Sequence, residues 1–185
     1  MNKVSVKAVR LMLAALLALG LAACNEAEQP SQKLAPVAFH SSDECHVCGM
    51  IIGDFPGPKA EVVEQGSVKK FCSTAEMLGW WLQPENQHLT AKIYVHDMGR
   101  SAWASPDDKY LIDATEAYYV AGTQLKGAMG VVLASFADEQ AAQALATREG
   151  GRVLRFSEID QQVLQVNAAA HAAHDAAPVD PHTGH

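Results

Sequence analysis

The feature that most limits how this chain can fold is its first segment, which ends at a cysteine. Three basic residues precede an apolar run that finishes in Leu21-Ala22-Ala23-Cys24. This pattern is typical of a secretory signal peptide, and the run is shorter than the roughly 20 apolar residues that span a bilayer. We expect residues 1–23 to be removed and Cys24, placed as in a bacterial lipobox, to be lipidated. A plain signal peptide and an N-terminal membrane anchor are the alternatives.

A lipid on Cys24 would hold the protein at a bacterial membrane, facing the periplasm, and the outer membrane is favoured over the inner. That compartment is oxidising, so cysteines there are normally paired. Beyond the anchor the chain has only Cys45, Cys48 and Cys72. An odd number of thiols fits a structural disulfide framework poorly.

Composition divides the rest of the chain into three parts. Residues 24–42 are polar and interrupted by proline, which predicts a flexible tether. Residues 43–166 form the expected folded domain. Residues 167–185 are alanine-rich and of low complexity, which predicts a disordered tail. About 125 residues of core suffice for one domain or for two small repeats that share one core.

The charge balance argues against nucleic acid as a partner. The chain has 14 basic and 21 acidic residues and a formal charge of −7. Removal of the signal peptide, with Lys3, Lys7 and Arg10, makes the mature chain more negative still. An acidic surface suits a cationic cargo, a basic partner or simple solubility, and it repels phosphate backbones.

The hydrophobic pattern predicts alternating short strands and helices. We expect strands at 60–65 and 67–72, joined by a turn at Gln65-Gly66, and a helix at 74–82 with a capping box formed by Ser73 and Glu76. Further strands are expected at 91–97, at Trp103, at 130–136 and at 151–156, and further helices at 138–150 and 157–166, whereas 110–122 is ambiguous.

Two stretches suggest an internal repeat. Phe71-Cys72-Ser73-Thr74-Ala75-Glu76 and Phe156-Ser157-Glu158-Ile159-Asp160 both leave a strand at phenylalanine and enter a helix through serine and an acid. The similarity is short enough to arise by chance. The predicted fold class is α+β, with two small ββα-type repeats in one compact unit and a boundary near residues 85–105.

The stretch Cys45-His46-Val47-Cys48-Gly49-Met50 concentrates soft ligands. A C-x-x-C pair indicates a redox dithiol, half of a zinc site or a soft-metal site. The dithiol alternative lacks the helix that normally follows the pair, because Gly49 and two nearby prolines come next. The zinc alternative lacks a second C-x-x-C pair, although Cys72 and a histidine would complete four ligands.

Methionine favours the third possibility. Thioether and thiolate sulfur select Cu(I), whereas zinc almost never takes methionine. Met50 follows the pair directly, and Met129 lies between glycines in an expected loop, unlike Met77, whose helical spacing predicts a core position. His96 is a further candidate ligand, and His46 an outward-facing spectator. The tail histidines would bind metal only weakly: His171, His174, His182 and His185.

The chain as a whole resembles the NosL family of copper-binding lipoproteins. The resemblance covers essentially the whole mature core, and its most specific part is the lipobox together with the C-x-x-C-G-M element. The matching stretches are Cys24, 43–52, 55–62, 71–78, 93–97, Trp103, 113–114, 117–120, 129–130 and 150–153.

The resemblance implies a non-enzymatic periplasmic Cu(I) chaperone, anchored by its lipid, that serves assembly of the copper centres of nitrous oxide reductase in denitrification. It implies as partners a periplasmic β-helix protein and its membrane ABC transporter. It places the family's metal ligands on Cys48, Met50 and Met129, with Cys45 matching the first cysteine, and it implies two ββα-type repeats related to treble-clef and heavy-metal-associated domains. It assigns no role to Cys72.

Overall fold

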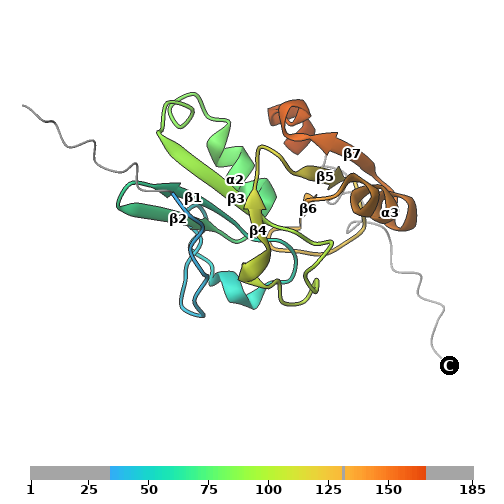
Figure 1. The fold of residues 1–185 in the computed structure, drawn as a ribbon, viewed down its shortest axis with the longest axis horizontal. Coiled ribbons are helices and arrows are strands. Elements are labelled where there is room, and N and C mark those ends of the chain that lie inside the picture. The colour runs from blue at the N-terminus through green and yellow to red at the C-terminus, as the bar shows by residue number, and fades with distance from the viewer. Residues whose placement is uncertain (1–33, 131, 166–185) are drawn as a thin grey trace, which may run out of the picture. The chain divides into compact units, whose positions relative to one another are not determined.

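The computed structural model describes residues 34–130 and 132–165. The predicted signal peptide, Cys24, the first part of the tether and the histidine-bearing tail lie outside these residues. Within them, no helix has the length and apolar character needed to cross a membrane. The described chain is mixed α+β and contains two antiparallel sheets (Figure 1).

The first sheet has four strands in the order β2-β1-β3-β4. These are β1 (Ala60–Glu64), β2 (Ser67–Phe71), β3 (Ala91–His96) and β4 (Leu111–Asp113). The first two form the expected hairpin, in which Glu64 pairs with Ser67 across the turn. Gly66 has a φ of 83° there, a conformation that favours glycine. Helix α2 (Thr74–Trp81) follows β2.

The second sheet has three strands in the order β6-β5-β7. These are β5 (Tyr118–Ala121), β6 (Ala134–Phe136) and β7 (Arg152–Arg155), and helix α3 (Glu139–Glu149) lies between β6 and β7 in the chain. Asp138 begins α3 by accepting a hydrogen bond from the Ala141 amide at 2.8 Å. Gly150, with a φ of 76°, ends it.

Strands β1, β2 and β3 of the first sheet have the same connectivity as β5, β6 and β7 of the second. In each, a hairpin leads into a helix, and the strand after the helix pairs antiparallel with the first strand of the hairpin. The junction equivalent to Phe71-Cys72-Ser73 is therefore Phe136-Ala137-Asp138. The sequence comparison matched 71–76 with 156–160 instead, because it followed residue types and ignored the order of the strands.

One hydrophobic core is shared by the two sheets. Phe71, Val95 and Met77 are fully buried from the first sheet and α2, and Tyr119 and Leu133 join the same cluster from the second half. A smaller cluster, which includes Val120, Phe136 and Leu145, lies between the second sheet and α3. Met77 is thus a core residue, as its helical spacing predicts.

Hydrogen bonds also join the two sheets. The Met98 amide donates to the Ser135 carbonyl at 2.8 Å, and the Ser135 hydroxyl donates to the His96 carbonyl at 2.7 Å. The Thr74 hydroxyl donates to the Leu133 carbonyl. Since Ser135 and Thr74 are buried, these bonds satisfy polar groups that water does not reach.

Several elements differ from their predicted limits. The expected strand at Trp103 is only an isolated bridge between Ala102 and Ser105. The strand expected over 130–136 is confined to β6, and the ambiguous stretch 110–122 contains β4 and β5 with a turn between them. The last helix begins at 161, after a 3-10 turn at Phe156–Glu158. Asp160 accepts from the Val163 amide at 2.7 Å, so it begins the helix in place of Ser157.

Candidate metal centre

The stretch from Cys45 to Met50 forms a closed turn. The Cys45 amide donates to the Met50 carbonyl and the Gly49 amide donates to the Cys45 carbonyl, both at 2.9 Å. Gly49 has a φ of 71°, which explains why glycine follows the second cysteine. The turn buries Cys45, leaves Cys48 half-buried and exposes His46 and Val47. Both thiols therefore lie on the side of the turn that faces the domain.

The turn is fixed to the first sheet beside its second strand. The His46 amide donates to the Lys70 carbonyl of β2 at 2.8 Å. The imidazole of His46 lies edge-on to the rings of Phe71 and Trp80, with centroids 5.8 Å and 5.5 Å away. His46 therefore holds the turn against β2 and α2.

A third thiol meets the pair from the junction between β2 and α2. The Sγ of Cys72 lies 3.7 Å from the Sγ of Cys48. Cys45 donates from its Sγ to Oε2 of Glu76 at 3.1 Å. The ligand atoms of Cys45, Cys48, Cys72 and Glu76 all lie within 4.8 Å of one another, and the described cysteines are all free thiols. The structure thus adds two residues to the predicted C-x-x-C pair.

The helix start explains the position of Cys72 and Glu76. Ser73 begins α2 by accepting a hydrogen bond from the Glu76 amide at 3.1 Å. The capping box predicted from the sequence is only half formed, because the carboxylate of Glu76 accepts from the Cys45 thiol. The sequence signals for these roles were weak: Cys72 is a lone cysteine, and Glu76 has the spacing of an ordinary capping residue.

The environment keeps the buried thiols protonated. Burial raises the pKa of Cys45, the backbone amides of Cys48, Cys72 and Val47 oppose this, and the hydrogen bond to Glu76 adds to it. Burial, followed by the charges of Cys45 and Glu76, raises the pKa of Cys72 strongly. Three thiols and a carboxylate cannot all ionise at such short distances without a cation. A bound metal ion would supply that charge and would displace protons.

Lys59 is a buried cation that interacts electrostatically with Cys72 of this cluster. It is 4% exposed and donates from Nζ to the carbonyls of Phe55 and Pro56, at 2.6 Å and 3.2 Å. Burial lowers the pKa of Lys59 to about 8, and the negative charge of an ionised Cys72 opposes that shift. Lys59 would therefore stabilise thiolates at the cluster.

The two predicted methionine ligands occupy different settings. Met50 is half-buried and packs against the core beside the turn. Met129 is 58% exposed and has a φ of 59°, which is uncommon for a residue with a side chain. Met129 lines an open hollow of about 480 Å³ together with Val47, Glu76 and Trp80. It therefore borders the same hollow as Glu76, the carboxylate that lies beside the three thiols.

His96 lies elsewhere. It is 1% exposed, its Nδ1 accepts from the Lys59 amide at 3.1 Å, and its Nε2 lies 3.0 Å from Oδ1 of Asp108. Burial lowers the pKa of His96, and Asp108 opposes the shift. Both ring nitrogens therefore already have partners, and the structure does not place His96 among the cluster of cysteines.

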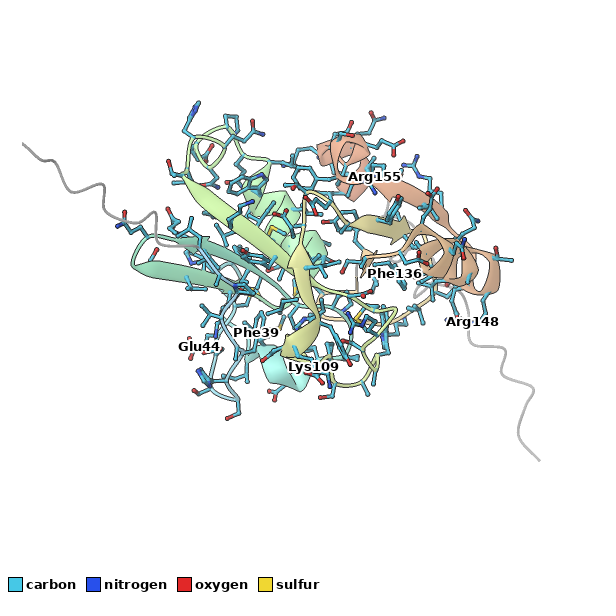
Figure 2. The ribbon with its side chains drawn as sticks, in the orientation of Figure 1. Phe39, Glu44, Lys109, Phe136, Arg148 and Arg155 are labelled. Atoms are coloured by element: carbon cyan, nitrogen blue, oxygen red, sulfur yellow. The ribbon has the colours of Figure 1, made fainter. Side chains whose placement is uncertain are left out.

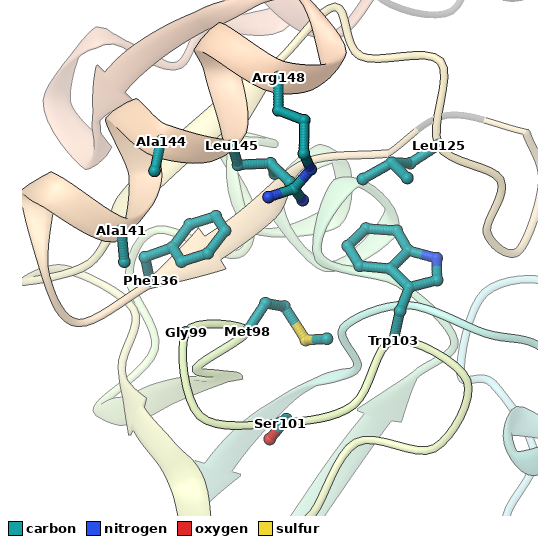
Figure 3. A pocket seen from close by; sticks show the side chains of 10 residues that line it. All are labelled: Met98, Gly99, Ser101, Trp103, Leu125, Phe136, Ala141, Ala144, Leu145 and Arg148. Carbon is teal, nitrogen blue, oxygen red and sulfur yellow. The ribbon is translucent and has the colours of Figure 1, made fainter.

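A second hollow, of about 400 Å³, lies beside α3 (Figure 3). Figure 3 shows Phe136 and Leu145 on one side of it, Trp103 on the other and Arg148 extending over its mouth. Its only sulfur is the thioether of Met98. This hollow is chemically unlike the one beside the thiol cluster.

Comparison with known proteins identifies the family of this chain. The family model NosL matches residues 36–164. The chain belongs to the NosL family. A protein of Stutzerimonas stutzeri named "Copper-binding lipoprotein NosL" is 67% identical over 94% of this chain and 93% of its own length. A protein of the same name from Achromobacter cycloclastes is 35% identical over 83% of this chain and 81% of its own length.

A solved NosL structure has the same fold. The crystal structure of the copper chaperone NosL from Shewanella denitrificans superposes with a TM-score of 0.67 at 43% identity, over 70% of this chain and 98% of that one. The family membership that the sequence motifs predicted is therefore confirmed.

Proposed function

We propose that this chain is a Cu(I) chaperone, a non-catalytic carrier whose cargo is held at the turn Cys45–Met50. The observation on which this rests is the approach of Cys48 and Cys72 to 3.7 Å, with Cys45 beside them. Thiolates are the ligands that Cu(I) prefers, and two or three suffice for it. The names of the relatives, a copper-binding lipoprotein and a copper chaperone, support the same cargo.

The proposed ligands are the thiolates of Cys45, Cys48 and Cys72, with the thioethers of Met50 and Met129 as exchangeable donors. Met50 belongs to the turn itself, and Met129 is exposed across the neighbouring hollow. A low-coordinate Cu(I) ion accepts an incoming donor readily, because it does not need a complete shell. His96 is left out of this set because its ring nitrogens are engaged.

The hollow beside the cluster supplies a route for transfer. Val47 is 51% exposed and Met129 58%, and both line it together with Trp80. Apart from Glu76, its polar lining consists of neutral side chains such as Gln83 and Gln161. An apolar partner surface placed here would exclude water while a donor of the partner replaces one of the protein's sulfurs. Met129 would be the last protein ligand to release the ion.

The anchor and the partners follow from the family. Cys24 would hold the carrier at a periplasmic membrane surface, in keeping with the lipoprotein names of the relatives. The resemblance supports delivery of copper toward nitrous oxide reductase, through a periplasmic β-helix protein and its ABC transporter. The shared connectivity of strands β1–β3 and β5–β7 supports two ββα-type repeats as the origin of the domain.

One observation favours a different function. Three thiols and the Glu76 carboxylate amount to four ligands, which is the usual number for structural zinc. In that case the cluster would only stabilise the fold, and the methionines would have no role at the site. Selectivity between the two metals therefore distinguishes the functions.

The deciding experiment is an anaerobic titration of the reduced mature chain, beginning at Cys24 and held in detergent. Cu(I) is added in competition with a Cu(I) chelator, and Zn(II) is then tested against a zinc chelator under the same conditions. Tight binding of one Cu(I) per chain, with much weaker zinc, is expected. Tight zinc with weak Cu(I) would overturn the chaperone function and leave a structural site.

A further inference from the structure

The segment before the metal-binding turn is held on the charged face of the first sheet. Residues 34–40, which we call the strap, follow the predicted lipid anchor and precede the turn (Figures 1 and 2). Four hydrogen bonds fix the strap to three strands and to the 3-10 turn η3 (Asp108–Tyr110). They join Tyr94 Oη to the Leu34 carbonyl, the Val37 amide to Glu61 Oε1, Lys70 Nζ to the Ala38 carbonyl, and the Phe39 amide to Asp108 Oδ2.

Glu61 is the unusual member of this surface. It is fully buried in the middle of β1, opposite Lys70 on one side and Tyr94 on the other. Its Oε1 accepts from the Val37 amide at 2.8 Å, whereas its Oε2 is buried with no hydrogen-bond partner among the described residues. An ionised carboxylate with an unsatisfied buried oxygen is costly. The strap therefore covers a group that is more stable there when protonated.

The charges around Glu61 point the same way. Burial raises the pKa of Glu61 to about 7; the nearby charges of Asp108 and Asp43 raise it too, while the Val37 amide and Lys70 lower it. Burial and then Asp113 raise the pKa of Tyr94, Lys92 opposes this, and Glu61 adds the smallest contribution upward. His96 and Lys59 face the same side of the sheet. They are already bonded to each other, because the Lys59 amide donates to Nδ1 of His96.

Lys70 connects the strap to the metal-binding turn. Its ammonium group donates to the Ala38 carbonyl of the strap and to Asp43, and it lies 5.1 Å from the centroid of the Phe39 ring. Its backbone carbonyl accepts from His46 between the two cysteines. Asp43 in turn accepts from the His40 amide at 2.7 Å. Movement of the strap therefore changes the partners of the residues that hold the turn.

We propose that protonated Glu61 holds the strap on the sheet, and that the docked strap positions the turn bearing Cys45 and Cys48. Ionisation of Glu61 favours the released strap, because release lets water reach the second oxygen. The effect of the turn's position on copper binding rests on the proposed function, whereas the docking of the strap does not. Release of the seven strap residues would lengthen the connection to Cys24 by up to about 25 Å.

The direction of the pH dependence follows from linkage. Release of the strap would return the Glu61 carboxyl group to water, so its pKa would fall from about 7 toward its ordinary value of 4.5. Docking is therefore strongest below pH 4.5 and weakens as the pH rises to about 7. From pH 6 to pH 8 the docking equilibrium should fall about tenfold.

The test is amide hydrogen exchange of the mature chain in detergent, followed between pH 5 and pH 8 and expressed as protection factors. These correct for the chemical effect of pH on exchange. Protection at Val37 and Phe39 should fall with pH in the native chain and stay constant in Glu61→Gln, which is neutral at every pH. Glu64→Gln, on the same strand but paired with Lys69, is the matched control and should keep the native pH profile.

The proposal would be overturned by native protection at Val37 that does not vary with pH, or by a Glu61→Gln variant that keeps the native pH profile. Val37→Pro removes the donor from the strap side and leaves the core untouched, so it should lower protection of 34–40 at all pH values. Unchanged protection of the remaining strap amides in that variant would also contradict the proposal.

Coupling to the turn is measured separately, by exchange at the His46 amide and by Cu(I) competition at pH 6 and pH 8. If the strap positions the turn, His46 protection falls together with that of Val37, and Glu61→Gln removes this loss. Tight Cu(I) binding together with strap protection that does not vary with pH would overturn the proposal about Glu61 and leave the chaperone function standing. Absent Cu(I) binding with a pH-dependent strap would do the reverse.

Discussion

The two strand-to-helix junctions of this protein have the same backbone plan and different chemistry. Phe71-Cys72-Ser73 leads from β2 into α2, and Phe136-Ala137-Asp138 leads from β6 into α3. Each has a buried phenylalanine at the strand end and a capping residue at the helix start. The residue between them is a thiol in one and a methyl group in the other. The equivalent position thus holds a buried thiol, a proposed ligand, in one junction and an exposed methyl group in the other.

The surroundings of the two junctions extend this difference. Beside α2 the hollow is bordered by Glu76 and Met129, and the turn Cys45–Met50 supplies two more thiols. Beside α3 the hollow has Arg148 over its mouth and the thioether of Met98 inside (Figure 3). Sulfur and a carboxylate attract a cation, whereas a guanidinium repels it. The proposed metal site therefore belongs to only one half of a similar scaffold.

The largest expected effect comes from making the first junction like the second. Cys72→Ala removes a thiolate that lies 3.7 Å from Cys48. The affinity for Cu(I) should fall about 100-fold, or about 2.7 kcal/mol. Competition with a Cu(I) chelator measures it. The Cys48→Ala variant should behave similarly, and native affinity in Cys72→Ala would show that the C-x-x-C turn binds copper alone.

The pH dependence of binding tests the buried thiols that only the first junction brings together. Burial raises the pKa of Cys45 and of Cys72, so both are protonated near neutral pH and Cu(I) must displace their protons. The apparent affinity should rise with pH, by about tenfold per unit for each displaced proton. The chelator competition repeated at pH 6.5, 7.5 and 8.5 measures the slope. Cys45→Ala should lower that slope; an unchanged slope would mean that Cys45 loses no proton.

A smaller effect is expected at the hollow. Met129→Leu keeps the size of an exposed side chain and removes its thioether, so Cu(I) affinity should fall about tenfold, or about 1.4 kcal/mol. Met98→Leu, which removes the thioether from the hollow beside α3, is the matched control and should have no effect on affinity. Equal losses in both variants would indicate that methionine acts through stability and not as a ligand.

The smallest effect tests the second junction directly. Ala137→Cys places a thiol at the position equivalent to Cys72, but the part of the chain that the structure describes brings no other cysteine there. The number of Cu(I) ions bound per chain should stay at one, and the affinity should stay within about twofold of the native value. A second tightly bound Cu(I) would show that the junction itself, and not its neighbours, makes the site.

Much of the fold was predictable from local patterns. The turn at Gln65-Gly66, the caps at Ser73 and Asp138 and the buried position of Met77 all follow from residue type and spacing. The limits of β6 were not, because an apolar run such as 130–136 suits either a strand or a loop. The start of the last helix was not either, because Ser157 and Asp160 are both capping residue types. Tertiary pairing with β5 decided where β6 begins.

The site was predictable only in part for the same reason. The sequence identified the C-x-x-C-G-M stretch, whose two thiols share one turn because their spacing is local and Gly49 closes it. Cys72 is 24 residues from Cys48, and Glu76 is 31 from Cys45. No local pattern specifies contacts over such separations, and His96 looked equally available until its two partners were visible.

The sequence by itself determined the family, the soft-ligand turn and the elements that local chemistry specifies. The tertiary structure decided which distant groups join the turn: the hairpin β1–β2 and the start of α2 place Cys72 and Glu76 beside it. It also decided that Glu61, an ordinary acid in a strand, is buried under the strap. Burial and long-range pairing set these outcomes, because both depend on the packing of the whole domain.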